Sequence, residues 1–272
     1  MGSPGGGCSA TGPIPVADVG TLIAVPNSSD HLLAADIATA AGELLLAVRD
    51  ELADEPEQFR KDEGDRRAHE FIVQQLGSER PNDAVLSEEG QDDHARLKVD
   101  RVWIVDPLDG TREFGEPGRT DWAVHVALCS GGSPIAGAVA LPALGITLST
   151  AAPGVVAPST GAAPRVISSR SRPGPAAEAI SLAMGGELLF MGSAGAKAMA
   201  VVRGEADVYA HTGGQFEWDN CAPAAVAEAA GFHVSRIDGS PLRYNNADPY
   251  LPDLLICRPE LAAAAIEAAS GF

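Results

Sequence analysis

The first clear periodicity in the chain follows Ser29, where apolar side chains recur every three or four residues. This spacing predicts an amphipathic helix over residues 31–53, with Ser29 or Asp30 as its N-cap. A second helix with an apolar inner face is predicted over residues 65–79. Residues 54–64 between them are charged and lack the pattern, so we expect this stretch to be mobile.

Short runs of β-branched and aromatic residues predict strands in the first half of the chain. They span residues 84–87, 102–105, 122–129, 134–141 and 146–150. The second half alternates strands with helices, which is typical of an α/β sheet covered on both faces. Its predicted strands span 165–168, 187–191, 206–210, 232–237 and 254–257, and its predicted helices span 174–185, 195–203, 219–230 and 259–269.

A segment rich in proline, glycine and alanine, residues 151–164, is interpreted as a hairpin or boundary loop. It separates an N-terminal α+β half, residues 29–155, from a C-terminal α/β half, residues 156–272. Residues 1–28 are rich in glycine, proline and serine, and they lack the charged start and apolar core of a signal peptide. We therefore expect them to form a disordered tail.

Composition narrows the possible partners. The 272 residues include 37 acidic and 19 basic side chains, and the formal net charge is −18. Such a surface repels nucleic-acid polymers, but bound cations can invert the local sign for a small phosphate ester. No apolar run reaches the roughly 18 residues of a membrane span. The four cysteines are scattered, which indicates free thiols and a cytoplasmic location.

The most informative stretch is residues 103–111, Trp-Ile-Val-Asp-Pro-Leu-Asp-Gly-Thr. The strand at its start is expected to stop at Pro107, because proline has no backbone donor. Asp106 and Asp109 would then lie on a bend. Their oxygens, with the carbonyl of Leu108 between them, can converge on a hard cation such as Mg²⁺. A surface turn with two solvated aspartates is the alternative.

The end of the stretch has the chemistry of a phosphate-binding turn. Gly110 permits close backbone approach, and a helical turn beginning at Thr111 would direct free N–H groups toward a phosphate. One competing chemistry is excluded. Phosphatases of the haloacid dehalogenase class use D-x-D-G-T with the first aspartate as nucleophile. Aligning that pattern here puts the nucleophile at Pro107, which cannot attack phosphorus.

The whole stretch resembles the signature of the lithium-sensitive, magnesium-dependent phosphatases. That superfamily includes inositol monophosphatases, fructose-1,6-bisphosphatases and 3'(2'),5'-bisphosphate nucleotidases. The resemblance covers residues from about 30 to 270. It implies a layered αβαβα sandwich of two stacked halves with the metal site between them, and it suggests a homodimer.

The resemblance also implies further metal ligands. In the superfamily an acidic pair before the signature supplies one ligand, which implies Glu88, and a Trp-Asp pair before an alanine-rich helix implies Asp219. From the residues alone, a pair such as Glu88-Glu89 is most often solvated, and Asp219 is the natural N-cap of its helix. Two or three Mg²⁺ ions are expected. The implied metal ligands are Glu88, Asp106, Leu108, Asp109 and Asp219.

Two catalytic residues and a substrate pocket follow from the same resemblance. Thr111, with Asp65, would take a proton from the attacking water. The family's T-x-x-D is replaced here by Asp-Glu-Gly-Asp at residues 62–65, so a plain N-cap remains the alternative for Asp65. A G-S-x-x-x-K-like element implies pocket roles for Ser193 and Lys197. The predicted substrate-binding residues are Glu88, Leu108, Asp109, Gly110, Thr111, Ser193, Lys197 and Asp219.

The implied reaction is hydrolysis of a phosphate monoester by metal-activated water, attacking phosphorus in line. Residues 109–114 read Asp-Gly-Thr-Arg-Glu-Phe, which is similar to the D-G-T-[KR]-E-F of bisphosphate nucleotidases. This favours 3'-phosphoadenosine 5'-phosphate and its sulfated form, and a place in sulfate assimilation. Inositol 1-phosphate or fructose 1,6-bisphosphate is the alternative substrate. A divalent-metal-binding regulatory module without turnover is the alternative from another class.

Overall fold

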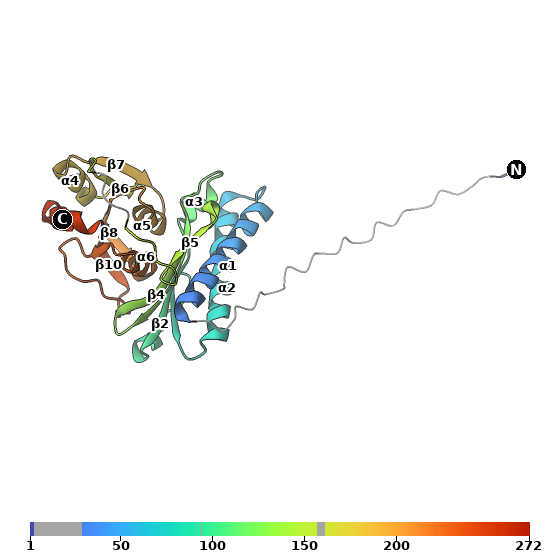
Figure 1. Cartoon of the computed structure of the whole chain (residues 1–272). Coiled ribbons are helices and arrows are strands. Elements are labelled where there is room, and N and C mark those ends of the chain that lie inside the picture. Colours follow the sequence, from blue (N-terminus) through green and yellow to red (C-terminus); the bar gives the residue numbers. More distant parts are fainter. Residues whose placement is uncertain (3–28, 93, 157–160) are drawn as a thin grey trace.

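The computed structural model describes residues 1–2, 29–92, 94–156 and 161–272 (Figure 1). This part of the chain forms alternating layers of helices and sheets. Helices α1 and α2 form one outer layer, α4 and α7 form the other, and α5 and α6 lie between the two sheets. The predicted layered αβαβα sandwich is therefore confirmed. The segment predicted to be a tail lies outside the described residues, apart from residues 1–2.

The outer helices α1 (Asp30–Glu51) and α2 (Glu57–Glu79) cover one face of the first sheet. Ser29 caps α1, accepting a hydrogen bond from the backbone N–H of Leu32 at 3.5 Å. By length and composition α1 could cross a membrane. Its apolar side is instead buried against α2 and the sheet, in a cluster that includes Leu45, Ile72 and Trp103. It is therefore a core helix of this fold.

Most of residues 54–64, expected to be mobile, is helical, because α2 begins at Glu57 rather than near Asp65. The buried Arg60 donates to backbone carbonyl groups at 2.8 to 3.3 Å. Ion pairs one helical turn apart replace the missing apolar stripe. These pairs are Lys61–Glu57, Arg66–Glu63, Arg66–Glu70 and Arg67–Glu63. Since Asp65 lies well inside the helix, its reading as an N-cap is wrong.

The first sheet has the strand order β1-β2-β3-β4-β5. Strands β1 and β2 are parallel, and the other neighbours are antiparallel. The predicted strands match within one residue at each end, except for β2. The bounds are β1 (Ala84–Ser87), β2 (Arg101–Asp109), β3 (Ala123–Ser130), β4 (Ser133–Leu141) and β5 (Ile146–Ser149), with short 3₁₀ helices at Ala95–Lys98 and Pro142–Leu144.

Strand β2 continues through Pro107 to Asp109, so the prediction that it stops before the two acids is wrong. Its pairing with β3 slips by one residue between Asp106, opposite His125, and Asp109, opposite Ala123. A β-bulge of this kind tolerates a proline, because one residue there needs no ladder hydrogen bond. The extra residue also brings both aspartates to the same face of the sheet, which regular alternation would not do.

The second sheet has the order β7-β6-β8-β10-β9. Strand β6 runs parallel to β7 and β8, and β10 runs antiparallel to β8 and β9. Strand β8 is longer than predicted, because its polar and glycine-rich end still pairs with β10. The bounds are β6 (Arg165–Ser169), β7 (Glu187–Met191), β8 (Val208–Phe216), β9 (His233–Ser235) and β10 (Tyr250–Cys257). The outer helices are α4 (Pro175–Ala183) and α7 (Ala262–Ala269), preceded by a 3₁₀ helix at Pro259–Leu261.

The central helices α5 (Ala194–Val202) and α6 (Glu217–Ala229) fill the space between the sheets. Every residue of α5 is buried, as expected for a helix packed on all sides. The central core cluster joins residues of both sheets and both helices. In the described residues β5 is the last strand of the first sheet along the chain, and β6 is the first strand of the second sheet. The exact boundary between the two halves at residue 155 stays a prediction.

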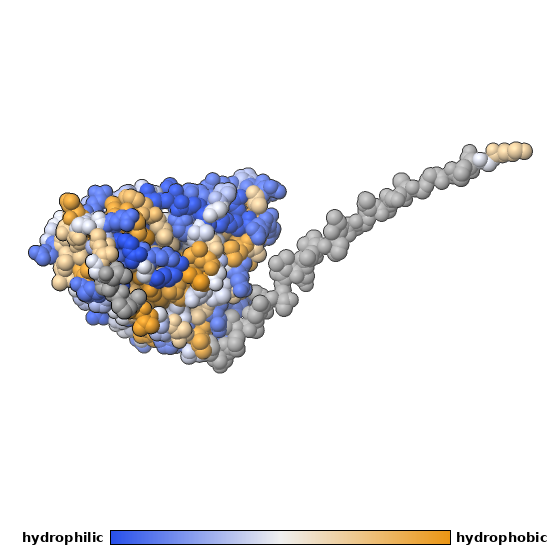
Figure 2. All heavy atoms as spheres, turned by 45° about the horizontal axis from the view of Figure 1, so that its top comes forward, coloured by the Kyte–Doolittle hydropathy of each residue, from blue (hydrophilic) through white to orange (hydrophobic). Residues whose placement is uncertain are grey.

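On the face shown in Figure 2, hydrophilic and hydrophobic residues are intermixed. Three cysteines, Cys129, Cys221 and Cys257, are free and buried, in agreement with the predicted free thiols. Burial raises the pKa of Cys129 to about 11, so this group stays a neutral thiol. Cys8 lies outside the described residues.

Candidate active site

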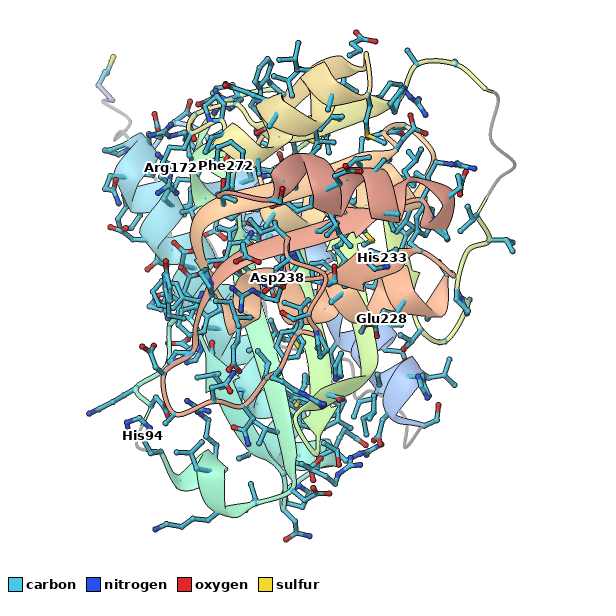
Figure 3. All side chains as sticks on the ribbon, turned by 90° about the vertical axis from the view of Figure 1, so that its left-hand side faces the viewer. His94, Arg172, Glu228, His233, Asp238 and Phe272 are labelled. Atoms are coloured by element: carbon cyan, nitrogen blue, oxygen red, sulfur yellow. The ribbon has the colours of Figure 1, made fainter. Side chains whose placement is uncertain are left out.

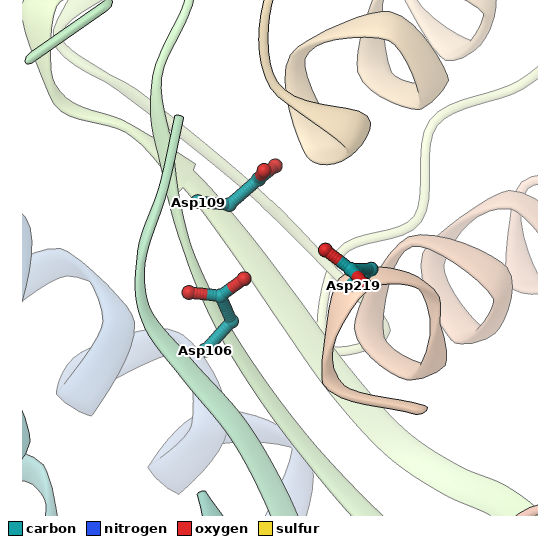
Figure 4. Close-up of side chains that lie close together, drawn as sticks. All are labelled: Asp106, Asp109 and Asp219. Atoms are coloured by element: carbon teal, nitrogen blue, oxygen red, sulfur yellow. The ribbon is translucent and has the colours of Figure 1, made fainter. Parts of the chain in front are cut away.

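Three aspartates converge where the two sheets face each other across the central helices (Figure 4). Asp106 and Asp109 come from the bulge of β2, and Asp219 comes from the first turn of α6. One carboxylate oxygen of each lies within 4.8 Å of the others. Asp106 is 1% exposed and Asp109 is 7% exposed, so these are not solvated surface acids. The surface-turn interpretation of the signature is therefore wrong.

Asp219 is the third residue of α6, so the prediction that it is the N-cap is wrong. The helix begins at Glu217, whose N–H donates to the carbonyl of Pro249 at 2.8 Å. The Asp219 carboxylate reaches back and accepts from the N–H of Phe216 at 2.6 Å through Oδ2. This interaction still stabilises the helix start. Within the described chain, Oδ1 of Asp219 has no hydrogen-bond partner, and it is free to bind a ligand.

Glu88 follows β1 and lines the same pocket as Asp109 and Asp219. Burial of its carboxyl group, reinforced by the charge of Asp219, raises the pKa of Glu88 to about 7. Burial and Glu88 likewise raise the pKa of Asp106 well above its usual range, and burial with Asp109 raises that of Asp219 to about 6. Like charges this close need a counter-ion. A set of carboxylate oxygens at this spacing fits a hard divalent cation.

Asp109 is held by the start of α5. It accepts hydrogen bonds from Ser193 Oγ at 2.5 Å, the Gly195 N–H at 2.6 Å and the Ala194 N–H at 3.1 Å. Ser193 has φ of 51°, which a non-glycine residue rarely adopts. Its hydroxyl both donates to Asp109 and accepts from the Ala196 N–H at 2.9 Å, which stabilises this conformation. Ser193, predicted to contact substrate, thus directly supports Asp109.

His125 on β3 is a buried residue of the site that the sequence did not single out. Its Nε2 lies 3.2 Å from Asp109 Oδ2, and its Nδ1 lies 3.0 Å from the carbonyl of Trp218. Burial alone would raise the pKa of Asp109, but His125 and Lys197 outweigh it, so that pKa lies below its usual range. The signal available in the sequence was one titratable side chain inside an otherwise apolar strand.

The predicted catalytic pair is brought together. Thr111 begins a short helix, α3 (Thr111–Gly115), as predicted, and its Oγ1 lies 3.4 Å from Asp65 Oδ1 and 3.1 Å from the carbonyl of Leu108. Burial, with the charges of Glu89 and Glu88, raises the pKa of Asp65 to about 7. A carboxylate with such a pKa can exchange a proton near neutral pH.

A pocket of about 560 Å³ opens beside the acids. Gly110 lines it with φ of 87°, and a Cβ there would come within 3.1 Å of Ser193, so glycine is needed. Lys197 also lines the pocket, but its ammonium group is buried and donates to the carbonyl of Ser193 at 2.5 Å. Two exposed arginines also line the pocket: Arg112, from the Asp-Gly-Thr-Arg-Glu-Phe stretch, and Arg172, which the sequence did not single out. Arg172 is labelled in Figure 3.

The chain belongs to the inositol monophosphatase family, whose sequence model matches residues 29–270. It is 51% identical over 246 residues to the 3'-phosphoadenosine 5'-phosphate phosphatase of Mycobacterium leprae, covering 86% of this chain and 91% of that protein. It is 32% identical over 198 residues to the 3'(2'),5'-bisphosphate nucleotidase CysQ of Escherichia coli, covering 69% and 80%. The crystal structure of CysQ from Bacteroides thetaiotaomicron, 29% identical, superimposes with a TM-score of 0.70 over 84% of this chain and 97% of that one.

Proposed function

We propose that this protein is a Mg²⁺-dependent phosphatase that removes the 3'-phosphate of 3'-phosphoadenosine 5'-phosphate and of its 5'-phosphosulfate form. The observation that carries the proposal is the convergence of Asp106, Asp109 and Asp219 within 4.8 Å beside a pocket. The 51% identity to a protein named for this activity supports the choice of substrate.

The donor set fits the metal that the family implies. Glu88, Asp106, Asp109 and Asp219 would hold Mg²⁺, with the carbonyl of Leu108 as a further oxygen ligand. The raised pKa values of Glu88 and Asp219 come from burial and from repulsion by neighbouring acids, and a bound cation would offset both. Bound Mg²⁺ supplies a positive charge that acidifies water and stabilises the negative charge of the transferring phosphoryl group. The number of ions, two or three, stays a prediction.

The protein groups then have defined tasks. The phosphate enters next to Gly110, which lines the pocket beside the acids. Thr111 and Asp65 orient the attacking water, and Asp65 accepts its proton. The water oxygen forms a bond to phosphorus while the bond from phosphorus to the 3'-oxygen breaks. The 3'-oxygen leaves with the bonding electron pair and takes a proton from solvent to become the ribose hydroxyl, and Asp65 later returns its proton to solvent. Inorganic phosphate is the second product.

The pocket supports a substrate with more than one anionic group. Its volume of about 560 Å³ falls in the range of small-molecule sites. Arg112 and Arg172 add positive charge to the pocket lining, which suits a second phosphate or sulfate. The aromatic rings of Phe216 and Trp218, stacked at 4.8 Å, form another part of the wall. An inositol monophosphate would use less of this surface.

A panel of substrates tests the proposal. Phosphate release is measured from 3'-phosphoadenosine 5'-phosphate, inositol 1-phosphate and fructose 1,6-bisphosphate, each with Mg²⁺ and with or without Li⁺. We expect the first to have the highest kcat/KM and to be inhibited by Li⁺. A preference for inositol 1-phosphate or fructose 1,6-bisphosphate would show that the proposed substrate is wrong. No phosphate release from any of the three would favour a metal-binding module without turnover. The first outcome would support the proposed role in sulfate assimilation, and the cytoplasmic location stays a prediction. The homodimer stays a prediction.

A further inference from the structure

His125 occupies an unusual position between the two sheets. It lies on β3 opposite Asp106, and its side chain is fully buried. Its Nδ1 faces the carbonyl of Trp218 at 3.0 Å, and since a carbonyl only accepts, Nδ1 carries a proton. Its Nε2 faces Asp109 Oδ2 at 3.2 Å. One imidazole thus connects a candidate metal ligand on β2 to the first turn of α6, directly before Asp219.

The contact with Asp109 acts on one particular oxygen. Oδ2 of Asp109 is also the acceptor for Ser193 Oγ and the Gly195 N–H. Oδ1 receives a single donor within the described residues, the Ala194 N–H at 3.1 Å. Nε2 of His125 contacts Oδ2 on the same side as the Ser193 and Gly195 donors, and together they keep Oδ2 toward α5. Oδ1, with a single donor, keeps more of its capacity to bind a ligand than Oδ2 does.

The neighbouring helix is shaped around the imidazole. A Cβ built on Gly195 would lie 2.0 Å from His125 Nε2, and its three nearest atoms all belong to the His125 ring. Real Cβ atoms do not approach a ring nitrogen so closely, so α5 can approach β3 here only with glycine. The same residue donates its N–H to Asp109 at 2.6 Å. The position of His125 is therefore part of how α5, Asp109 and α6 fit together.

We propose that His125 is a positioning residue of the metal site: it fixes the Asp109 carboxylate and the first turn of α6 at the separation at which Asp109 and Asp219 bind one divalent cation. The inference rests on the metal site of the proposed function and adds a residue to it. Groups that orient metal ligands in this way typically change metal affinity by about 10- to 100-fold when they are replaced.

Two substitutions separate the two contacts. In His125→Gln the side-chain amide can replace Nε2 and donate to Asp109, whereas in His125→Asn it can replace Nδ1 and donate only to Trp218. Mg²⁺ is titrated calorimetrically into each metal-free protein after its fold has been verified by circular dichroism. We expect His125→Asn to bind Mg²⁺ about 10- to 100-fold more weakly. His125→Gln should remain close to the wild type, and the KM for nucleotide at saturating Mg²⁺ should change little in either variant.

His233 offers a matched control. It lies on β9, the edge strand of the second sheet, partly buried, with its Nε2 2.9 Å from Ser235 Oγ (Figure 3). His233→Ala should leave Mg²⁺ affinity unchanged. Wild-type affinity in His125→Asn would overturn the inference. Equal weakening in His125→Asn and His125→Gln would also overturn it, since that result indicates lost packing and not a lost contact with Asp109.

A measurement on the wild-type protein does not depend on any variant folding. In protein with ¹⁵N-labelled histidine, the Nε2 resonance of His125 should shift when Mg²⁺ binds, because its neighbour Asp109 gains a cation. An unchanged resonance in Mg²⁺-saturated protein would contradict the inference. If the wild type binds no Mg²⁺, the metal site of the proposed function fails as well, and the calorimetric titration distinguishes that outcome from failure of the His125 role alone.

Discussion

Asp106 and Asp109 lie three residues apart on β2, yet hydrogen-bond donors surround Asp109 whereas other carboxylates surround Asp106. Asp109 belongs to a closed corner formed with His125, Ser193, Ala194 and Gly195, in which N–H and O–H donors surround it and its pKa is low. Asp106 belongs to an open corner formed with Glu88 and Asp219, where carboxylates face one another and their pKa values are raised.

The difference shows how the site divides the task of neutralising its charge. The protein itself stabilises the Asp109 carboxylate, which is charged before any ligand arrives. The open corner has fewer N–H and O–H donors than the closed corner. Its negative charge must therefore be balanced by protons or by a cation. Removing an acid from one corner should therefore have a different effect from removing an acid from the other.

The largest effect is expected from the open corner. Asp106→Asn and Asp219→Asn should each lower kcat by about 10³-fold or more at saturating Mg²⁺, because each removes a charged oxygen ligand worth several kcal/mol. Neither change should lower the thermal stability of the metal-free protein, because each relieves repulsion. Turnover of 3'-phosphoadenosine 5'-phosphate and thermal unfolding in a chelator measure the two effects. Near-normal rates in both variants would contradict the assignment of these ligands.

Asp109→Asn should instead destabilise the metal-free protein, by about 3 kcal/mol. The amide of asparagine would turn a donor toward Ser193 Oγ or the Gly195 N–H, and His125 would lose its buried counter-charge. Urea unfolding of the metal-free Asp109→Asn and Asp106→Asn proteins, measured in parallel, compares their free energies of unfolding. If both variants unfold at the same urea concentration, the two corners do not differ as we describe.

The open corner should also make the stability of the metal-free protein depend on pH. The pKa values of Glu88 and Asp219 in the folded protein, about 7 and about 6, lie above their ordinary values of 4.5 and 3.8. The folded state therefore binds more protons than the unfolded state, and stability falls as pH rises from about 4 to about 7. Saturating Mg²⁺ should remove most of this decrease. Thermal unfolding at pH 5 and pH 7.5, in chelator and in Mg²⁺, measures this dependence. A metal-free protein that is more stable at pH 7.5 than at pH 5 would contradict the prediction.

The smallest effect is expected outside both corners. Arg172→Gln should raise the KM for 3'-phosphoadenosine 5'-phosphate by about 10-fold, since a charge in the pocket lining contributes mainly to ground-state binding, with little change in kcat. Mg²⁺ affinity should be unchanged. Arg203→Gln is a suitable control, because Arg203 pairs with Glu205 at the end of α5. A lower kcat with unchanged KM in Arg172→Gln would place Arg172 in the chemical step.

The sequence predicted the layers, most strands and the acids, because a nine-residue signature and regular hydrophobic spacing carry that information. It placed Asp106 and Asp109 on a bend, because a proline ordinarily ends a strand. The structure keeps the strand by inserting a bulge, and a bulge depends on pairing with β3 that local sequence does not record. The result is nonetheless the predicted convergence of the two carboxylates.

Other errors have similar causes. Residues 54–64 lack an apolar stripe, so periodicity alone could not predict a helix whose stability comes from ion pairs and the buried Arg60. His125 lies far in sequence from Trp218, and only the packing of α6 on the first sheet brings them together. Tertiary contacts of this kind decide the finer features of the site. The predicted roles of Ser193 and Lys197 toward substrate stay predictions.

The close approach of α5 to β3 has a consequence for how this site can change over evolution. A side chain at position 195 collides with the ring at position 125, so neither position is free to vary alone. A lineage that first shortens the residue at 125 opens room for alanine or serine at 195, whereas the reverse order passes through a blocked intermediate. We expect the two positions to be substituted together in related chains, with the change at 125 occurring first.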